Sequence, residues 1–379
     1  MRSLSENISR LAAARAGPPG GTGVADRLVD MPIASPNPGA LRARVHVPAG
    51  LGRGAPLVVA LHGCTQNAAG YDRGTGWSTL ADRIGFALLL PEQVRANNPN
   101  LCFNWFQAHD IARTGGEAES IASMVADMVA RHELDPARVF VTGLSAGGAM
   151  AAAMLATYPQ VFAGGAVIGG LPYGCATGVP EALRRMRDGG TGDDAALVDR
   201  VRRASGGHDG PWPALSVWHG SADATVDVSN MERLGRQWRG VHGVEGVAPE
   251  VTRDRACEHR AWRGADGRVA VEEWRIAGMG HGVPLDPSGP DRLGEAGAYM
   301  LDVGLPSTAR IARSWGLGTG EEAADGAADA CPAPATAPVS APAARVLRPE
   351  RVERPRPFDP AGGVQATIER ALRSAGLMR

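Results

Sequence analysis

The sequence contains no lysine, because all 39 of its basic residues are arginine. This absence excludes any mechanism that needs a lysine Schiff base or the lysine of a phosphate-binding P-loop. A charge excess is also missing, since 40 acidic residues leave a formal net charge of −1. A balanced chain offers no general electrostatic attraction for nucleic acid or for an anionic membrane surface. We therefore expect neither as a partner.

Cysteine is scarce and widely spaced. The five cysteines are Cys64, Cys102, Cys175, Cys257 and Cys331. They form neither the closely spaced pairs of a zinc site nor the dense set of a small disulfide scaffold. We therefore expect no metal site, and an odd count allows at most two disulfides and one free thiol.

Long hydrophobic runs are absent as well. No stretch approaches the roughly 18–20 uninterrupted apolar residues that a membrane-spanning helix needs. Residues 1–17 have the pattern of a short amphipathic helix, and not the charged, then apolar, then small order of a secretory signal peptide. The sequence thus predicts no membrane span and leaves export without support from a signal peptide.

Glycine and proline, 51 and 28 residues, are by contrast abundant, and they are concentrated in particular places. Between residues 318 and 343, 17 of 26 residues are Ala, Pro or Gly, and none is aromatic. Such a segment has nothing large to bury and is typical of a linker. We predict four parts: an N-terminal helix and lead-in (1–40), one large domain (41–317), a linker (318–344) and a basic tail with a short helix (345–379). The tail is interpreted as solvated or docked on the domain, or alternatively as an anchor to a partner surface.

Within residues 41–317, short apolar runs alternate with helical segments. Runs closed by turn residues lie at 57–61, 86–90, 139–141 and 214–218, and glycine pairs at 164–165 and 169–170 are expected at strand ends. Apolar residues recur with helical spacing over 117–132, and 149–157 is rich in alanine. This alternation predicts an α/β fold, a doubly wound, mostly parallel sheet with helices on both faces.

One turn carries a candidate nucleophile. Gly143-Leu144-Ser145-Ala146-Gly147 follows the predicted strand 138–142 and precedes a predicted helix. A GxSxG sequence in this context is the nucleophile elbow of α/β-hydrolases, which lifts the serine hydroxyl above the sheet. An ordinary strand-to-helix turn with an incidental serine is the alternative.

A serine nucleophile needs a base and an acid that orients the base, and in this fold they follow in the order Ser, acid, His. Asp223 comes just after the strand 214–218, and Asp227 is its nearby competitor. His281 lies in a glycine-rich loop after the predicted strand 269–276. We predict Ser145, Asp223 and His281 as the catalytic residues; His62 and His219 more simply brace loops, and His109 is the remaining rival base.

The first buried strand ends in Leu61-His62-Gly63-Cys64, where this fold places half of its oxyanion hole. Backbone N–H groups must point at the developing negative oxygen, so the side chain there matters little. We predict the N–H groups of Cys64 and Ala146 as the two donors. Cys64 as a thiol nucleophile is a weaker alternative, because no histidine is positioned by chain order to activate it.

Taken together, these segments resemble the polyhydroxybutyrate-depolymerase-type esterases, which are related to feruloyl and acetylxylan esterases. The resemblance covers about residues 40–316 and is carried by LHGCTQ (61–66), LCFNWF (101–106), GLSAGGAM (143–150), YP-VFA (158–163), LPYGCA (171–176), HGSADATV (219–226) and GMGH (278–281). It implies the same three catalytic residues and ester hydrolysis through an acyl-enzyme. It also implies that no metal or organic cofactor takes part.

The resemblance implies further roles. A tryptophan in this family lies at the acyl- or polymer-binding surface, so we predict Trp105 as a substrate contact, with a place in the core as the alternative; Gln66 is a second predicted contact. If the chain is secreted, as relatives are, the implied disulfides are Cys64–Cys102 and Cys175–Cys257.

The expected substrate is a poly(3-hydroxybutyrate)-type polyester or its oligomers. A feruloyl or acetylxylan esterase with the same catalytic residues is the nearest alternative, and a non-catalytic binding protein with the same fold is an alternative of another class. The resemblance implies an extracellular protein, although without a visible signal peptide the cytoplasm stays an alternative. Contact of the tail with polymer granules is a further hypothesis.

Overall fold

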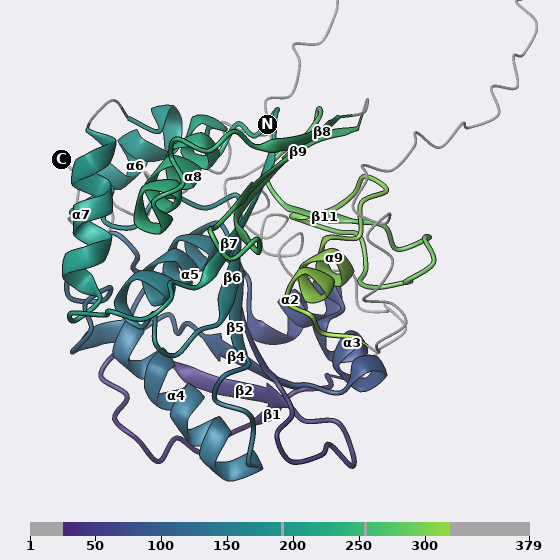
Figure 1. The fold of residues 1–379 in the computed structure, drawn as a ribbon. Helices are drawn as coiled ribbons and strands as arrows, with labels where there is room; N and C mark the ends of the chain where they lie inside the picture. Colours follow the sequence, from purple (N-terminus) through teal and green to yellow (C-terminus); the bar gives the residue numbers. More distant parts are fainter. Residues whose placement is uncertain (1–25, 191–192, 254–255, 319–379) are drawn as a thin grey trace, which may run out of the picture.

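The computed structural model of the protein describes residues 26–190, 193–253 and 256–318 (Figure 1). The predicted N-terminal helix, the linker beyond residue 318 and the C-terminal tail lie outside the described residues. Residues 26–40, predicted as a lead-in, contribute the first strand of the sheet.

A ten-stranded sheet forms the centre of the described part of the chain, with the order β1-β2-β4-β3-β5-β6-β7-β10-β9-β8. Its strands are β1 (Val29–Asp30), β2 (Arg42–His46), β3 (Leu57–Leu61), β4 (Ala87–Glu92), β5 (Val139–Leu144), β6 (Gly164–Ile168), β7 (Ala214–Gly220), β8 (Glu250–Arg253), β9 (Cys257–Arg263) and β10 (Val269–Ile276). The strands from β4 to β10 in this order run parallel, whereas β1, β2, β8 and β9 add antiparallel edges. The predicted mostly parallel α/β sheet is confirmed.

Helices cover both faces of the sheet (Figure 1). One face carries α4 (Gly116–His132), α5 (Ala146–Thr157), α6 (Val179–Asp188), α7 (Asp194–Ala204) and α8 (Ser229–His242). The other carries α2 (Ala68–Thr75), α3 (Trp77–Ile84) and α9 (Ser307–Ser314), with a small parallel pair formed by β11 (Val283–Leu285) and β12 (Met300–Asp302).

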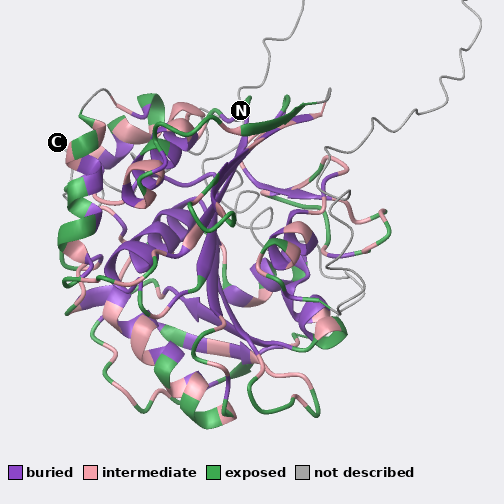
Figure 2. Cartoon of the chain, viewed as in Figure 1, coloured by how far each residue is buried: buried purple, intermediate pink, exposed green. Residues whose placement is uncertain are grey.

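The core is divided by the sheet into two apolar clusters. Val59 and Val141 face the cluster under α4 and α5, whereas their neighbours Val58 and Phe140 face the cluster under α2, α3 and α9. This alternation follows from the two-residue period of a strand. Every residue of α5 is buried, as Figure 2 shows at the centre of the molecule. A helix surrounded by core on all sides is a rigid support for whatever its N-terminus carries.

The predicted bounds of two strands, 57–61 and 269–276, match β3 and β10. The glycine pair 164–165 lies at a strand end as predicted, because it begins β6. A Cβ atom on Gly165 would lie 2.7 Å from Leu155 Cδ1 of α5. Gly165 is therefore needed for close packing of the helix on the strand.

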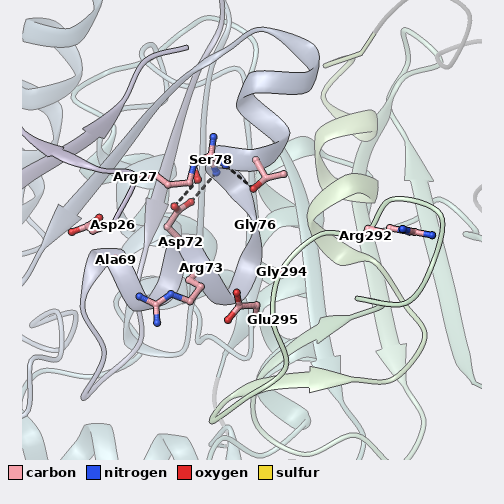
Figure 3. A pocket seen from close by; sticks show the side chains of 11 residues that line it. Asp26, Arg27, Ala69, Asp72, Arg73, Gly76, Ser78, Arg292, Gly294 and Glu295 are labelled. Carbon is pink, nitrogen blue, oxygen red and sulfur yellow. Dashed lines mark hydrogen bonds between the residues drawn. The ribbon is translucent and has the colours of Figure 1, made fainter. Parts of the chain in front are cut away.

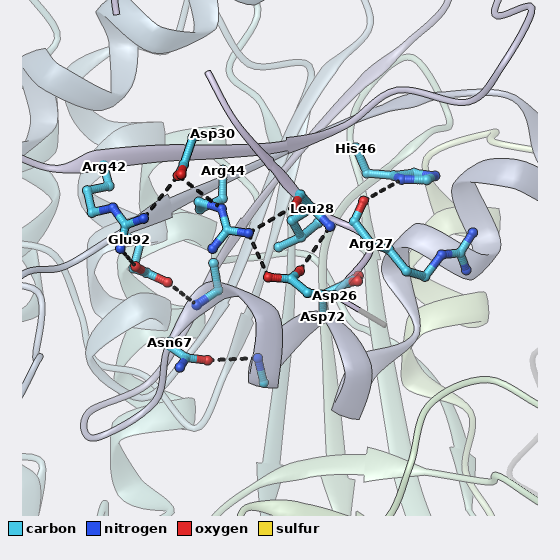
Figure 4. A network of polar contacts seen from close by, with 12 residues as sticks. Asp26, Arg27, Leu28, Asp30, Arg42, Arg44, His46, Asn67, Asp72 and Glu92 are labelled. Carbon is cyan, nitrogen blue, oxygen red and sulfur yellow. Dashed lines mark hydrogen bonds and ion pairs between the residues drawn. The ribbon is translucent and has the colours of Figure 1, made fainter. Parts of the chain in front are cut away.

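Charged side chains hold the antiparallel edge formed by β1 and β2 (Figure 4). Arg42 Nη1 lies 2.9 Å from Glu92 Oε1, and the second oxygen of Glu92 accepts the N–H of Ala68 at 2.8 Å. Glu92 ends β4 and Ala68 begins α2. The contacts thus connect the sheet edge to the helix that follows β3.

Candidate active site

The predicted catalytic residues follow three strands of the parallel part of the sheet. Ser145 comes directly after β5, Asp223 follows β7, and His281 follows β10. These strands are neighbours in the order β5-β6-β7-β10. Because parallel strands end at the same edge of a sheet, all three loops open at its carboxyl edge, where ligands bind in this class of fold.

Ser145 occupies a strained turn between β5 and α5. Its backbone has φ 58° and ψ −117°, a region that non-glycine residues rarely adopt. The turn is packed too tightly for larger neighbours: a Cβ on Gly143 would lie 2.4 Å from the carbonyl carbon of Gly147, and one on Gly147 would lie 2.3 Å from the oxygen of Leu61. The geometry is that of a nucleophile elbow.

Asp223 and His281 are joined by a short hydrogen bond, 2.7 Å between Asp223 Oδ2 and His281 Nδ1. The other carboxylate oxygen, Oδ1, accepts the N–H groups of Thr225 and Val226, each at 2.8 Å. Burial raises the pKa of Asp223, but hydrogen bonds from His219 and His281 outweigh it, so the pKa lies below its usual value. The carboxylate is therefore fixed in orientation and kept ionised.

His219 is a partner of Asp223 that the sequence reasoning missed. Its Nε2 lies 2.8 Å from the carbonyl oxygen of Val226 and 3.3 Å from Asp223 Oδ2. Its side chain is fully buried. The signal available in the sequence was the four-residue spacing between His219 and Asp223, since a tight turn after a strand brings such residues together. His219 braces a loop as predicted, and it also contacts the acid.

The position of the His281 ring relative to the elbow is fixed through β6. The N–H of Ser145 donates to the carbonyl of Ile168 at 2.9 Å. The next residue, Gly169, has φ +53°, and a Cβ there would lie 3.2 Å from His281 Cε1 and Nδ1. The His281 imidazole therefore lies against Gly169, the residue directly after the one whose carbonyl accepts the Ser145 N–H.

The loops that carry the acid and the histidine are also tied to each other. The N–H of Ser221 donates to Ile276, that of Ala222 donates to Met279, and the N–H of Gly278 donates to Ser221 Oγ, at 2.8, 3.0 and 2.9 Å. The ring of Tyr299 packs edge-on against His281 at 6.1 Å between centroids. The loops of Asp223 and His281 are thus connected by backbone contacts as well as by the hydrogen bond between the two side chains.

The rival acid and base have other partners. Asp227 accepts the N–H and the hydroxyl of Ser229 at the start of α8. His62 accepts the N–H of Gln93 at Nε2 (3.2 Å), so its Nδ1 donates to the carbonyl of Gly63 (2.8 Å). His109 is exposed and packs over Gly115 at the start of α4. Asp227 and His62 therefore have hydrogen-bond partners other than Asp223 and His281.

The two predicted oxyanion donors flank the elbow. Cys64 follows β3, which is paired with β5, and Ala146 is the first residue of α5. Among the described residues, neither N–H group donates a hydrogen bond. Gln66, a predicted substrate contact, instead uses Oε1 to accept the N–H of Gly63 at 2.8 Å. That bond holds the turn on which Cys64 lies.

One of the two implied disulfides forms. Cys64 and Cys102 are bonded, with their Cα atoms 4.2 Å apart. The pair Cys175–Cys257 is wrong, because Cys175 is a buried free thiol. The physical reason is that Cys175 lies in the core cluster under α4–α8, whereas Cys257 of β9 faces the cluster on the opposite side of the sheet.

Trp105, the other predicted substrate contact, lies mostly in the core. Its side chain belongs to the cluster under α4 and α5, the residue is 6% exposed, and it packs edge-on against Phe106 at 5.5 Å. This is the alternative that the sequence left open. Because Trp105 exposes so little surface, it can make only a small contact with a substrate.

A separate cavity of about 180 Å³ lies beside α2 and α3 (Figure 3). Asp72 and Ser78 contribute to its wall and are bonded to each other at 2.6 Å. Neither a histidine nor a cysteine is among the described residues that line it. The described lining therefore has no imidazole beside Ser78, and none of the predicted site residues contributes to it.

The described residues, 26–318 without the two short gaps, offer neither a metal cluster nor a helix that could span a membrane. They contain no group of three or more His, Cys, Asp or Glu side chains placed to hold a metal ion. None of their helices is long and apolar enough to cross a membrane.

Comparison with known proteins identifies the family. The family model described as "Esterase PHB depolymerase" matches residues 42–264. The chain is 46% identical to poly(3-hydroxyalkanoate) depolymerase C of Paucimonas lemoignei over 282 residues, 74% of this chain and 68% of the relative. It is 32% identical to an acetylxylan esterase of Coprinopsis cinerea, with 71% and 72% of the two chains covered.

The fold has a solved relative. An acetyl xylan esterase from Aspergillus awamori superposes with a TM-score of 0.62 at 27% identity, covering 67% of this chain and 93% of that one. The relatives are hydrolases of ester bonds, and the large parallel sheet with a nucleophile elbow is that of an α/β-hydrolase. The chain is therefore an ester hydrolase that belongs to the PHB depolymerase esterase family.

Proposed function

We propose that Ser145, His281 and Asp223 are the catalytic residues of this esterase. The observation that carries the proposal is the 2.7 Å contact between His281 Nδ1 and Asp223 Oδ2 at the same sheet edge as the strained turn of Ser145. A hydrogen bond from Nδ1 to the carboxylate leaves the lone pair of Nε2 free to accept a proton.

In the proposed reaction, Ser145 Oγ attacks the ester carbonyl while His281 Nε2 accepts the hydroxyl proton. The imidazolium is stabilised by Asp223 and then protonates the leaving alkoxide, which leaves an acyl-enzyme. Water, activated by the same histidine, releases the acid. The N–H groups of Cys64 and Ala146 hold the oxyanion of both tetrahedral intermediates.

The substrate we propose is a poly(3-hydroxyalkanoate), with poly(3-hydroxybutyrate) and its oligomers as the first to test. The support is the 46% identity, over 282 residues, to a depolymerase named for that polymer class. A sugar ester is the second candidate, since an acetylxylan esterase and a feruloyl esterase B of Talaromyces stipitatus are 32% and 30% identical.

Replacing the nucleophile tests the site. Ser145→Ala should lower kcat on p-nitrophenyl butyrate by about 10⁶-fold, because the acyl-enzyme cannot form. A fluorophosphonate probe should label the wild type at Ser145 and leave the variant unlabelled. Retention of more than a few per cent of the activity, or labelling elsewhere, would reject the assignment of Ser145. Failure of the probe to label the folded wild type would favour the non-catalytic alternative.

A substrate panel tests specificity. Amorphous poly(3-hydroxybutyrate), acetylated xylan and methyl ferulate are compared by initial rate with the same enzyme stock, with Ser145→Ala as the blank. We expect polyester to give the highest rate. A higher kcat/KM on acetylated xylan or on ferulate would move the assignment to the second candidate.

We also propose an extracellular location, supported by the resemblance to the depolymerase and by the Cys64–Cys102 disulfide, a bond that persists in oxidising compartments. Fractionation of the native host tests it.

Granule contact by residues 345–379, which lie outside the described residues, is supported only by their excess of arginine, eight against four acids. Truncation after Gly318 should then lower sedimentation with granules and leave p-nitrophenyl butyrate turnover unchanged.

A further inference from the structure

A buried carboxyl group lies behind the proposed oxyanion hole without taking part in the reaction. Glu117, the second residue of α4, is 1% exposed. Its Oε1 accepts hydrogen bonds from Gln93 Nε2 (2.5 Å) and Asn104 Nδ2 (2.8 Å), and its Oε2 accepts the backbone N–H of Asn104 (2.8 Å). A carboxylate is the one side chain that can accept from three such donors at once.

Both partners of Glu117 lead to the turn that carries Cys64. Gln93 donates its own N–H to His62 Nε2, and His62 Nδ1 in turn donates to the carbonyl of Gly63. Asn104 lies two residues after Cys102, which is covalently bonded to Cys64. The two branches therefore meet at residues 63–64, and Glu117 closes the ring on the other side.

The donors in this ring cannot easily turn away. Gln93 Oε1 accepts from the N–H of Val94 (2.9 Å) and from Asn97 Nδ2 (3.0 Å), and Asn104 Oδ1 accepts from Asn98 Nδ2 (2.9 Å). A flip of either amide would place an oxygen against the carboxylate and break these bonds. Each NH₂ group thus faces Glu117, and that of Gln93 also donates to the carbonyl of Cys102 at 3.1 Å.

The ionised form of Glu117 suits this arrangement. Burial and the nearby charge of Asp110 raise the pKa of the carboxyl to about 8, although the hydrogen bonds from Asn104 and Gln93 lower it. What favours the ionised form is therefore the geometry of the donors around it. Each carboxyl oxygen already faces an N–H group, so a protonated carboxyl would turn its O–H onto a donor. A negative charge is also favoured in the first turn of a helix.

The geometry points to Glu117 as a positioning residue for the oxyanion hole, acting through Gln93, His62 and Asn104 on the turn that presents the Cys64 N–H. This inference rests on the proposed function, since it assigns Glu117 a part in the same reaction. An oxyanion donor is effective only when held within a fraction of an ångström of its place, so loss of the ring should lower kcat more than it changes KM.

The test is the isosteric variant Glu117→Gln. A glutamine has one oxygen where the carboxylate has two, so in either orientation its NH₂ meets an N–H of Gln93 or Asn104. We expect kcat on p-nitrophenyl butyrate, normalised to sites titrated with a fluorophosphonate, to fall about 10–100-fold. The rate constant of phosphonylation should fall in parallel, whereas KM should change less than about threefold.

The matched control is Glu273→Gln on β10. Glu273 is also 1% exposed and pairs with Arg239 Nη1 at 2.7 Å, so this change likewise disturbs a buried acid. It should lower the melting temperature and leave kcat per titrated site unchanged. Equal kcat losses in both glutamine variants would show that any damaged core slows the enzyme, which would overturn the inference.

A milder variant keeps the test decisive if Glu117→Gln does not fold. Asn104→Ala removes one donor from the ring, and we expect a kcat loss of about 3–10-fold. In the double variant the losses should be less than multiplicative, because both changes act on one network. If both single variants keep a kcat per titrated site within twofold of the wild type, the positioning role of Glu117 is overturned, while the proposed function is not affected. Absence of Ser145-dependent turnover in the wild type would instead overturn the proposed function.

Discussion

The two sides of the site are held in place by different means. The oxyanion side, residues 62–66 and 101–105 with Glu117, is tied by a disulfide and by a ring of buried side-chain hydrogen bonds. The acid–base side, loops 219–226 and 277–282, is tied by backbone hydrogen bonds between the loops and by two imidazoles on one carboxylate. The fixed backbone amides of the oxyanion side need a rigid frame, whereas the acid–base side must tolerate a moving proton.

The largest effect is expected from removing the charge of Asp223 on the acid–base side. Asp223→Asn keeps the shape of the side chain but favours the wrong tautomer of His281, and kcat should fall about 10⁴-fold. Steady-state kinetics on p-nitrophenyl butyrate measure this loss. Asp227→Asn is the control, because Asp227 accepts the N–H and the hydroxyl of Ser229, and its kcat should match that of the wild type. A larger loss in the control would reject Asp223 as the acid.

Removing the Cys64–Cys102 disulfide tests how the oxyanion side is held in place. The double change Cys64→Ser/Cys102→Ser keeps the backbone N–H of residue 64 but opens a loop with a sequence separation of 38. We expect the free energy of unfolding to drop by about 3–4 kcal/mol and kcat to fall about tenfold. Urea denaturation and active-site-normalised kinetics measure the two effects.

The control for the disulfide is Cys175→Ala, which alters the buried free thiol. It should cost about 1 kcal/mol of stability and leave kcat unchanged. If the serine pair kept full kcat at a temperature where it is folded, the disulfide would serve stability only, and the oxyanion side would depend on its hydrogen bonds alone.

A smaller effect is expected from the second imidazole on the acid–base side. His219→Leu removes the donor that lies 3.3 Å from Asp223 Oδ2, and kcat should fall about tenfold with KM little changed. His219→Gln, whose amide N–H can take the place of Nε2–H, should recover most of the loss. Equal kcat values for the leucine and glutamine variants would mean that the contact with Asp223 does not matter to the reaction.

The smallest effect is on acid stability. Because hydrogen bonds hold the pKa of Asp223 below its value in the unfolded chain, about 3.8, the carboxylate stabilises the fold above that pH. The contribution should disappear as the pH falls from about 4 through the folded-state pKa. Urea denaturation of the wild type and of Asp223→Asn should therefore give a difference in unfolding free energy that shrinks on acidification; a difference independent of pH would contradict it.

Local pattern made much of the site predictable. The strand before Ser145 and the helix after it, with glycines at 143 and 147, specify a turn that only small neighbours permit. Asp223 and His281 are predicted because each follows a buried strand, and strands of a parallel sheet end on one side; the structure places them 2.7 Å apart. The same reasoning missed His219, Gln93 and Glu117, since what defines them is a contact with another side chain and not a place after a strand.

Pairings across space were the least predictable. Cys64–Cys102 and Cys175–Cys257 were implied by resemblance on equal terms, and only the first forms. Their spacing carries no information on which face of the sheet each cysteine occupies. Trp105 illustrates the same limit, because an aromatic residue near the site can face the substrate or the core, and it lies in the core.

By itself the sequence determined the order of strands and helices, the turn at Ser145 and the places of Asp223 and His281 after their strands, because these depend on periodicity and on turns of a few residues. The tertiary structure decided which partners each side chain has: the two imidazoles on Asp223, the disulfide that reaches Cys64 and the three donors around Glu117. The reason is physical. Local conformation depends on neighbours in the chain, whereas buried polar contacts depend on which strand edges and helix ends the whole fold brings together.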